Sequence, residues 1–224
     1  MSDSYREVAG YKEDADLGLG CGIPTEFVNL REGETVLDLG SGAGNDCFIA
    51  RKFVGDSGEV IGLDMTEEMV SLARKNAAKF GFGNVRFVLG EIENMPIESE
   101  TVDAVLSNCV LNLVPDKSKA FAEMYRVIRP GGRFSVSDIV LNGELPDGIR
   151  NGLMMYVGCV AGAMQKDEYL SAIAAAGFKN VAIKKTKTVS MPDETLLQFI
   201  SPDELARYRA QGNIVESVTV YAEK

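Results

Sequence analysis

The chain has 224 residues, a length that suits one large α/β domain or, as an alternative, two small ones. With 46% of its residues hydrophobic and 25% charged, its composition is typical of a soluble protein. Its 33 acidic and 23 basic residues give a formal net charge of −10, which argues against nucleic acid as a partner because phosphate binding needs a basic surface. No apolar run approaches the ~20 residues of a membrane span, and residues 1–7 are polar, so we expect a cytoplasmic protein with no membrane contact.

Short apolar segments alternate with helical patterns along most of the chain. After about 15 polar residues, residues 17–24 combine three glycines with Cys21 and Pro24 in a turn-rich stretch. We expect strands at residues 35–39, 59–63, 85–89, 102–108, 133–139, 181–188 and 215–221, and helices from residue 46 and over residues 66–80, 116–128 and 166–176. The segment Pro-Gly-Gly at 130–132 is expected to turn into the fifth strand. This alternation implies βαβ crossovers, an α/β fold class and a mostly parallel sheet.

The sequence VLDLGSGAGND at residues 36–46 indicates a buried strand that runs into a glycine turn and a helix start. Such a turn presents backbone N–H groups to a small ligand. Gly40, Gly42 and Gly44 give the chain much conformational freedom, which lowers stability unless something approaches the backbone closely. We therefore predict a ligand cradle; the alternative is a turn that serves only tight packing of strand against helix.

Two acids near this turn indicate which ligand it holds. In a dinucleotide-binding fingerprint the third glycine would stand where this chain has Asn45. Asp38 would repel a pyrophosphate and attract a cation, while Asp64 ends the next strand and is suited to accept hydrogen bonds from two ribose hydroxyls. S-adenosylmethionine carries an ammonium and a sulfonium and no phosphate. The pair of acids therefore favours S-adenosylmethionine over a nicotinamide or flavin cofactor.

Further cofactor contacts are expected at the carboxyl ends of the strands, where open α/β sheets bind their ligands. Met65 and Ile92 are candidates to sandwich the adenine ring, although ordinary core packing explains either one equally well. The predicted cofactor-binding residues are Asp38, Gly40, Ser41, Gly42, Gly44, Asp46, Asp64, Met65, Glu91, Ile92 and Asn108.

The four cysteines stand at positions 21, 47, 109 and 159, with no C-x-x-C pair and no histidine, which argues against a zinc site. Cys47 is expected to be a small buried hydrophobe. Cys21, Cys109 and Cys159 lie among small residues and turns that leave a sulfur open to approach, and three converging thiolates form a soft site for a thiophilic ion or metalloid. Without histidine the usual general base for an O- or N-methyl acceptor is missing, and Asp, Glu or Tyr would have to substitute for it, whereas an acceptor with its own lone pair needs no base.

The sequence resembles the arsenite S-adenosylmethionine methyltransferases. The matching segments are LGLGCG (17–22), DLGSGAG (38–44), DMT (64–66), SNCVLNL (107–113), PGGR (130–133), SDIV (137–140) and GCVAGA (158–163). The resemblance implies the Rossmann-like three-layer sandwich of class I methyltransferases, with a mostly parallel seven-stranded sheet and a reversed final hairpin. It also implies cysteines that hold As(III) beside the methyl donor.

Carried over by position, Cys109 and Cys159 would be the essential arsenic ligands and Cys21 the third thiolate. Residues 1–30 would form an N-terminal cap segment that carries Cys21, and residues 31–224 a methyltransferase domain with an acceptor-side insertion around 141–165. The arsenic lone pair would attack the sulfonium methyl in line and release S-adenosylhomocysteine. A thiol reductant would be a partner, and the protein would be a monomer or homodimer. The chain lacks a cysteine that many relatives carry upstream of the one matched by Cys21, and this departure bears on the thiol–disulfide steps of repeated methylation.

Two other functions are compatible with these residues. One is a methyltransferase for a small organic acceptor, in which the cysteines are structural. The other is a thiol-based metalloid-binding or sensing protein that keeps the fold without turnover.

Overall fold

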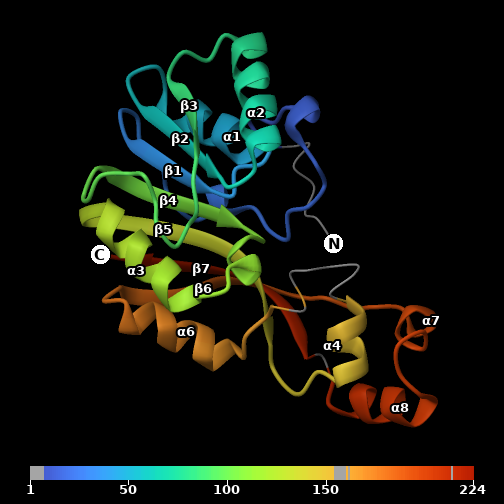
Figure 1. Cartoon of the computed structure of the whole chain (residues 1–224). Helices are drawn as coiled ribbons and strands as arrows, with labels where there is room; N and C mark the ends of the chain where they lie inside the picture. Colours follow the sequence, from blue (N-terminus) through green and yellow to red (C-terminus); the bar gives the residue numbers. More distant parts are fainter. Residues whose placement is uncertain (1–7, 154–159, 161, 213) are drawn as a thin grey trace.

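The computed structural model describes residues 8–153, 160, 162–212 and 214–224, and its strands form one sheet with the order β3-β2-β1-β4-β5-β7-β6 (Figure 1). The strands are β1 (Thr35–Leu39), β2 (Glu59–Asp64), β3 (Val85–Leu89), β4 (Val102–Asn108), β5 (Ile128–Leu141), β6 (Lys179–Thr188) and β7 (Val215–Glu223). Strands β1 to β5 are parallel, whereas β7 is antiparallel to both of its neighbours, β5 and β6. The predicted α/β class and the mostly parallel seven-stranded sheet with a reversed final hairpin are confirmed.

Helices cover both faces of the sheet. α1 (Asn45–Val54) and α2 (Glu67–Phe80) pack on one face, and α3 (Lys117–Val127) and α6 (Lys166–Ala175) pack on the other (Figure 1). Successive side chains of β1 alternate between two apolar clusters: Val36 belongs to the cluster under α1 and α2, and Leu37 and Leu39 belong to the cluster under α3 and α6. No helix within the described ranges is long and apolar enough to cross a membrane.

The ends of α2 show how local sequence sets a helix boundary. Gly81 ends the helix in the left-handed conformation at φ 70°, as the sequence predicts. At the other end, Glu67 and Glu68 lie in the first turn, where acids favour the helix dipole. Thr66 precedes them, and although threonine is a common residue at this position, its side chain makes no capping hydrogen bond. Its backbone N–H instead donates to Asp64 Oδ1 at 2.9 Å, so the strand-end acid takes part in starting the helix.

β5 is longer than predicted, because the expected turn at residues 130–132 lies inside the strand. Val102 pairs with Ile128 and Ala104 pairs with Arg133, so the additional residues are accommodated as an irregularity of the ladder. Gly131 takes a positive φ of 80° there. Pairing with β4 on both sides of the glycines therefore outweighs their preference for a turn.

A third apolar cluster lies beyond the ends of the sheet, among helices for which no element was predicted beyond the acceptor-side insertion around 141–165. α4 (Asp147–Leu153), α7 (Asp193–Leu196) and α8 (Pro202–Ala210) lie together there (Figure 1). Ile149, Leu196 and Tyr208, one from each helix, are buried in this cluster. A sequence signal for α8 exists: Ser201 and Glu204 form a capping box, and Pro202 occupies the first helical turn.

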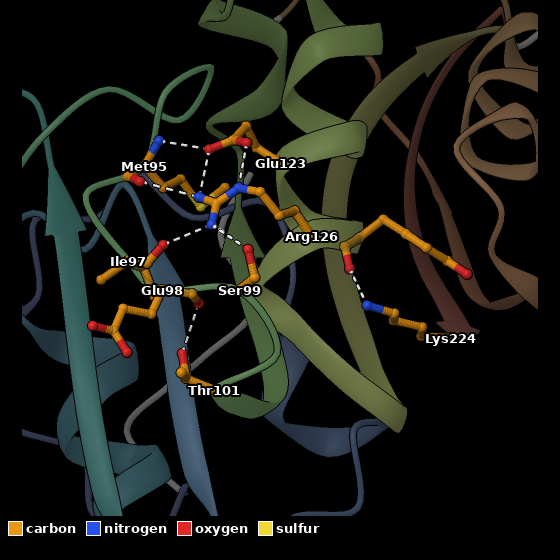
Figure 2. Close-up of polar contacts among 9 residues, drawn as sticks. Met95, Ile97, Glu98, Ser99, Thr101, Glu123, Arg126 and Lys224 are labelled. Atoms are coloured by element: carbon orange, nitrogen blue, oxygen red, sulfur yellow. Dashed lines mark hydrogen bonds and ion pairs between the residues drawn. The ribbon is translucent and has the colours of Figure 1, made fainter.

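The connection between β3 and β4 is fastened to α3 by one arginine (Figure 2). Arg126 donates to the carbonyl oxygens of Ile97 at 2.8 Å and Met95 at 3.1 Å and to Ser99 Oγ at 3.2 Å. Glu123 pairs with Arg126 at 2.6 Å and accepts the Met95 N–H at 2.8 Å. Because this connection follows the end of β3 directly, α3 helps to fix that strand end.

We expect Tyr169→Phe to lower the free energy of unfolding by about 2 kcal/mol, or Tm by roughly 4–8 °C. The Tyr169 hydroxyl donates to Asp138 Oδ2 at 2.8 Å, and both side chains are fully buried. Burial raises the pKa of Asp138 to about 7, and the tyrosine bond opposes this rise. Thermal melting measures the change. Tyr221→Phe, which removes a bond to Glu223 at the partly exposed surface, is the control and should shift Tm by less than about 2 °C. Equal melting of the two variants would contradict the expectation.

Candidate functional site

A cavity of about 870 Å³ lies at the carboxyl ends of β1, β2, β3 and β4. It is bounded by the glycine turn, by residues after β2 and β3, by the end of β4 and by the segment 15–20. The predicted cofactor-binding residues that line it are Asp38, Gly40, Ser41, Gly42, Asp46, Asp64, Met65, Glu91, Ile92 and Asn108; Gly44 does not. The cavity therefore occupies the edge of the sheet where α/β proteins bind small ligands.

The glycine turn is packed tightly against the protein itself. A Cβ atom on Gly40 would lie 2.4 Å from Val110 Cγ2, and one on Gly44 would lie 2.8 Å from Phe48 Cζ. Both glycines also have positive φ angles, 64° and 98°. Gly42 has a φ of 52° but more space around it. Close packing, the alternative considered for this turn, thus accounts for Gly40 and Gly44, so the case for a ligand depends on the cavity and its polar groups.

Two carboxyl groups lie close together at the base of the turn. Asp38 and Asp46 are both buried, with 2% and 9% of their surface exposed. Burial raises the pKa of Asp38 well above its usual range, and the charge of Asp46 raises it further. Cys47 is fully buried, as predicted, and its thiol donates to Asp38 Oδ2 at 3.3 Å. A cation in the cavity would stabilise the ionised form of both acids.

Asp64 connects the glycine turn to β2. Its Oδ2 accepts the Gly42 N–H and its Oδ1 accepts the Thr66 N–H, both at 2.9 Å. Each carboxylate oxygen keeps a second lone pair that can accept a ligand hydroxyl. Ser41 Oγ and Asn45 Oδ1 also belong to the cavity wall, and within the described part of the chain these buried atoms have no hydrogen-bond partner. Buried polar atoms are nearly always satisfied, so these two fit a ligand with polar groups.

Apolar side chains surround the opening of the cavity. Met65 is 74% exposed, and Ile92 packs partly against the core under α3 and α6. Leu17, Leu19 and Leu113 also line the cavity and are exposed, and none of them was among the predicted cofactor-binding residues. A contiguous set of exposed apolar side chains beside a cavity favours a ligand with an apolar or aromatic part.

The structure brings Cys21 and Cys109 to one backbone carbonyl. The Cys109 N–H donates to Ser137 O at 2.7 Å, and the Cys21 thiol donates to the same oxygen at 3.4 Å. Cys109 follows β4 with a positive φ of 62° and lines the cavity. Cys159, the third predicted ligand, lies outside the described residues. Within those residues no group of three or more acids and cysteines is arranged to hold a metal ion.

Both sulfurs are more enclosed than their glycine-rich surroundings suggest. Cys21 is 4% exposed and Cys109 is 7% exposed, and both belong to the third apolar cluster. The expectation of open sulfurs is therefore wrong for the resting structure. The reason is that the segment 20–22 lies flat on the strand ends, held by Asn108 and by Ser217 Oγ, which donates to Cys21 O at 2.7 Å. The glycine-rich sequence around Cys21 predicts turns but gives no sign of this long-range contact.

Comparison with known proteins adds three findings. Residues 30–177 match a protein family described as "Methyltransferase domain". The chain is 46% identical over 218 residues to the arsenite methyltransferase of Halobacterium salinarum, covering 97% of this chain and 54% of the relative. It is similar to the crystal structure of an arsenic(III) S-adenosylmethionine methyltransferase from Chlamydomonas reinhardtii, with a TM-score of 0.77, 32% identity, and coverage of 92% of this chain and 67% of the other.

A more distant solved structure shows the fold alone. It is a phosphoethanolamine N-methyltransferase of Haemonchus contortus in complex with S-adenosyl-L-methionine, with a TM-score of 0.70, 17% identity, and coverage of 90% of this chain and 51% of that one. The chain spans about half the length of the curated relatives it matches.

Proposed function

Because the chain belongs to the arsenite methyltransferase family, within the class I S-adenosylmethionine-dependent methyltransferases, we propose that it transfers a methyl group from S-adenosylmethionine to trivalent arsenic. One observation carries this proposal: Cys109 lines the cavity at the end of β4 and shares the Ser137 carbonyl with the Cys21 thiol. A soft acceptor bound to these sulfurs is adjacent to the space proposed for the donor.

The residues of the cavity fit S-adenosylmethionine, which supplies a methyl group activated by a sulfonium charge. Asp38 and Asp46 are the groups proposed to attract its cationic end, and Asp64 is proposed to accept the ribose hydroxyls. Met65 and Ile92 are proposed to flank the adenine. Ser41 and Asn45 also line the cavity, and their buried Oγ and Oδ1 atoms, which have no hydrogen-bond partner among the described residues, are proposed as further polar contacts of the donor. The remaining proposed contacts are the backbone of Gly40 and Gly42 and the side chain of Glu91. Gly44 does not line the cavity and is not proposed as a contact. The side chain of Asn108 lines the cavity, but its amide is engaged with Cys21, Gly22 and Asp46.

For the arsenic site we propose Cys21, Cys109 and Cys159 as the three ligands. Each thiol that binds arsenous acid forms an S–As bond and releases one water, its proton leaving with the arsenic-bound hydroxide, so the lone pair of the arsenic stays available as the nucleophile. No general base is needed for such an acceptor. The apolar surroundings of Cys21 and Cys109 exclude water, which protects the As–S bonds from hydrolysis.

The proposal includes a reducing compartment, because oxidised cysteines do not bind arsenic. The cytoplasm with a thiol reductant such as glutathione meets this requirement, and arsenic detoxification is the corresponding biological role. We expect the protein to be a monomer or a homodimer. We also propose that residues 1–30 form an N-terminal cap segment and that the region around 141–165 is an insertion on the acceptor side of the domain.

The test is direct. Incubation of the protein with arsenite, glutathione and methyl-labelled S-adenosylmethionine should give methylated arsenic and S-adenosylhomocysteine in equal amounts, with neither formed when arsenite is omitted. If the protein bound arsenite but produced no methylated arsenic, the binding or sensing function would be supported instead. If label moved only to an organic acceptor, the cysteines would be structural.

A further inference from the structure

Asn108 stands between the cavity and the loop that carries Cys21. Its side-chain oxygen accepts the N–H groups of Cys21 at 3.0 Å and Gly22 at 3.3 Å, and its amide nitrogen donates to Gly22 O at 2.9 Å. The same nitrogen donates to Asp46 Oδ2 at 3.2 Å. One amide therefore contacts the thiol-bearing loop on one side and a buried acid of the cavity on the other.

The loop has little freedom to move sideways at this contact. A Cβ atom on Gly20 would lie 2.7 Å from Asn108 Nδ2, and one on Gly22 would lie 2.4 Å from Ser137 Oγ. Only glycine fits at these two positions, so the loop lies directly on the strand ends. The position of the Cys21 sulfur at Ser137 O is thus set by the same surface to which Asn108 belongs.

On the cavity side, Asp46 is electrostatically coupled to Asp38, and both line the space proposed for the donor. A cationic ligand there acts on the charge and position of Asp46, and Asp46 accepts a hydrogen bond from the Asn108 amide nitrogen. Cys21 itself does not line the cavity. Leu19 and Gly20, which precede Cys21, and Asn108 do line it, so a cavity ligand can act on the Cys21 thiol along the loop itself or through Asp46 and Asn108.

We propose that Asn108 is a positioning residue that couples occupancy of the donor cavity to the order of the Cys21 loop. The inference rests on the proposed function, since it takes the cavity as the donor site. Filling the cavity holds the loop closed on Ser137, and by reciprocity a loop held closed by a bound metalloid strengthens donor binding. Binding of the methyl donor thus brings the Cys21 thiol into its place beside Cys109.

Cysteine alkylation tests the coupling without arsenic. Wild-type protein and Asn108→Ala are labelled with N-ethylmaleimide, with and without saturating S-adenosylhomocysteine, and Cys21 and Cys47 are followed separately by peptide mass spectrometry. In the wild type, we expect the ligand to slow Cys21 labelling about fivefold or more, the lower range of measured couplings. In Asn108→Ala, Cys21 should label faster and the ligand should no longer change its rate. Cys47, which is fully buried, reports global opening in the same samples.

Asn84→Ala is the matched control. Asn84 also fastens backbone segments, donating to Gly55 O and Gly58 O at 2.8 Å, but it lies away from the cavity. This variant should keep the wild-type protection of Cys21. The isosteric Asn108→Asp keeps the acceptor for the Cys21 N–H, loses the donors to Asp46 and Gly22 O, and adds a like charge beside Asp46. This variant should lose protection as Asn108→Ala does.

Several outcomes would overturn the inference. They are wild-type protection in both Asn108 variants, no protection in a wild-type protein that binds S-adenosylhomocysteine by calorimetry, or loss of that binding in both variants, which would make Asn108 a plain cofactor contact. A wild-type protein that bound no S-adenosylhomocysteine would remove the proposed function, and the inference with it. The calorimetric control separates the two failures.

Discussion

Replacing Cys109 by serine is expected to lower arsenic methylation at least about 100-fold, while the affinity for S-adenosylhomocysteine stays within about threefold of the wild type. Cys109 is the proposed ligand that lines the cavity itself. Serine keeps the size of the side chain but offers a hard oxygen, which is a poor ligand for a soft element. Loss of this ligand would release the arsenic from its position beside the methyl donor. Because we expect catalysis to come mainly from holding the two reactants close together, the rate of methyl transfer should fall. Quantifying methylated arsenic against enzyme concentration measures the effect.

Cys47→Ser is the matched control for thiol removal. Cys47 is buried outside the cavity wall and its thiol donates to Asp38, a bond that a serine hydroxyl can keep. We expect turnover within about threefold of the wild type for this variant, a change of less than about 0.7 kcal/mol. Unchanged turnover in Cys109→Ser, with a folded protein and intact cofactor binding, would show that arsenic is not held at the end of β4.

Asp64→Ala should weaken the binding of S-adenosylhomocysteine about 100-fold, or by about 3 kcal/mol. Two backbone N–H groups, of Gly42 and Thr66, lose a charged acceptor, so the glycine turn loosens. The proposed ribose contact disappears at the same time. Isothermal titration calorimetry measures the affinity, and Asp64→Asn, which keeps one acceptor oxygen, should give an intermediate value.

Asp103→Ala separates the role of Asp64 from general stability. Asp103 also accepts a backbone N–H, that of Thr35 at 2.8 Å, and pairs with Arg129 at 3.0 Å, but it lies at the amino end of β4. This variant should melt at a lower temperature and bind S-adenosylhomocysteine with nearly wild-type affinity. If Asp64→Ala kept wild-type affinity as well, neither the turn nor the ribose contact would depend on Asp64.

The strands and the main helices follow from local sequence because their signals are local. Short apolar or strand-like segments between turn residues predict each of the seven strands, although β6 is largely polar and exposed. Gly81 ends α2 in the conformation that glycine favours. The turn predicted at the glycines 131 and 132 was wrong because β4 pairs with β5 on both sides of them, which is a long-range contact that the local sequence does not display. α7 and α8 were missed although the Ser201 capping box marks the start of α8.

The candidate site likewise has some features that local sequence predicts and others that depend on long-range contacts. Strand ends and glycines predict where a cavity lies, because the geometry of parallel sheets brings those residues to one edge. The meeting of Cys21 with Cys109 is not encoded in any spacing; the small residues and turns around these cysteines suggested it, and the family resemblance made it specific. The roles of Asn108 and Ser217 in holding the Cys21 loop, and the burial of the two sulfurs, depend on contacts across the sheet that sequence patterns do not display.

The contact between Cys21 and Ser217 also has a consequence for biosynthesis. The two residues are 196 positions apart, and Ser217 lies on β7, the strand that inserts between β5 and β6. A ribosome that adds about 5–20 residues per second needs roughly 10–40 s to travel that distance. Throughout this interval the Cys21 loop lacks the hydroxyl that holds its carbonyl. The nascent chain therefore carries an unshielded thiol that oxidants and thiophilic ions can reach before the folded protein encloses it.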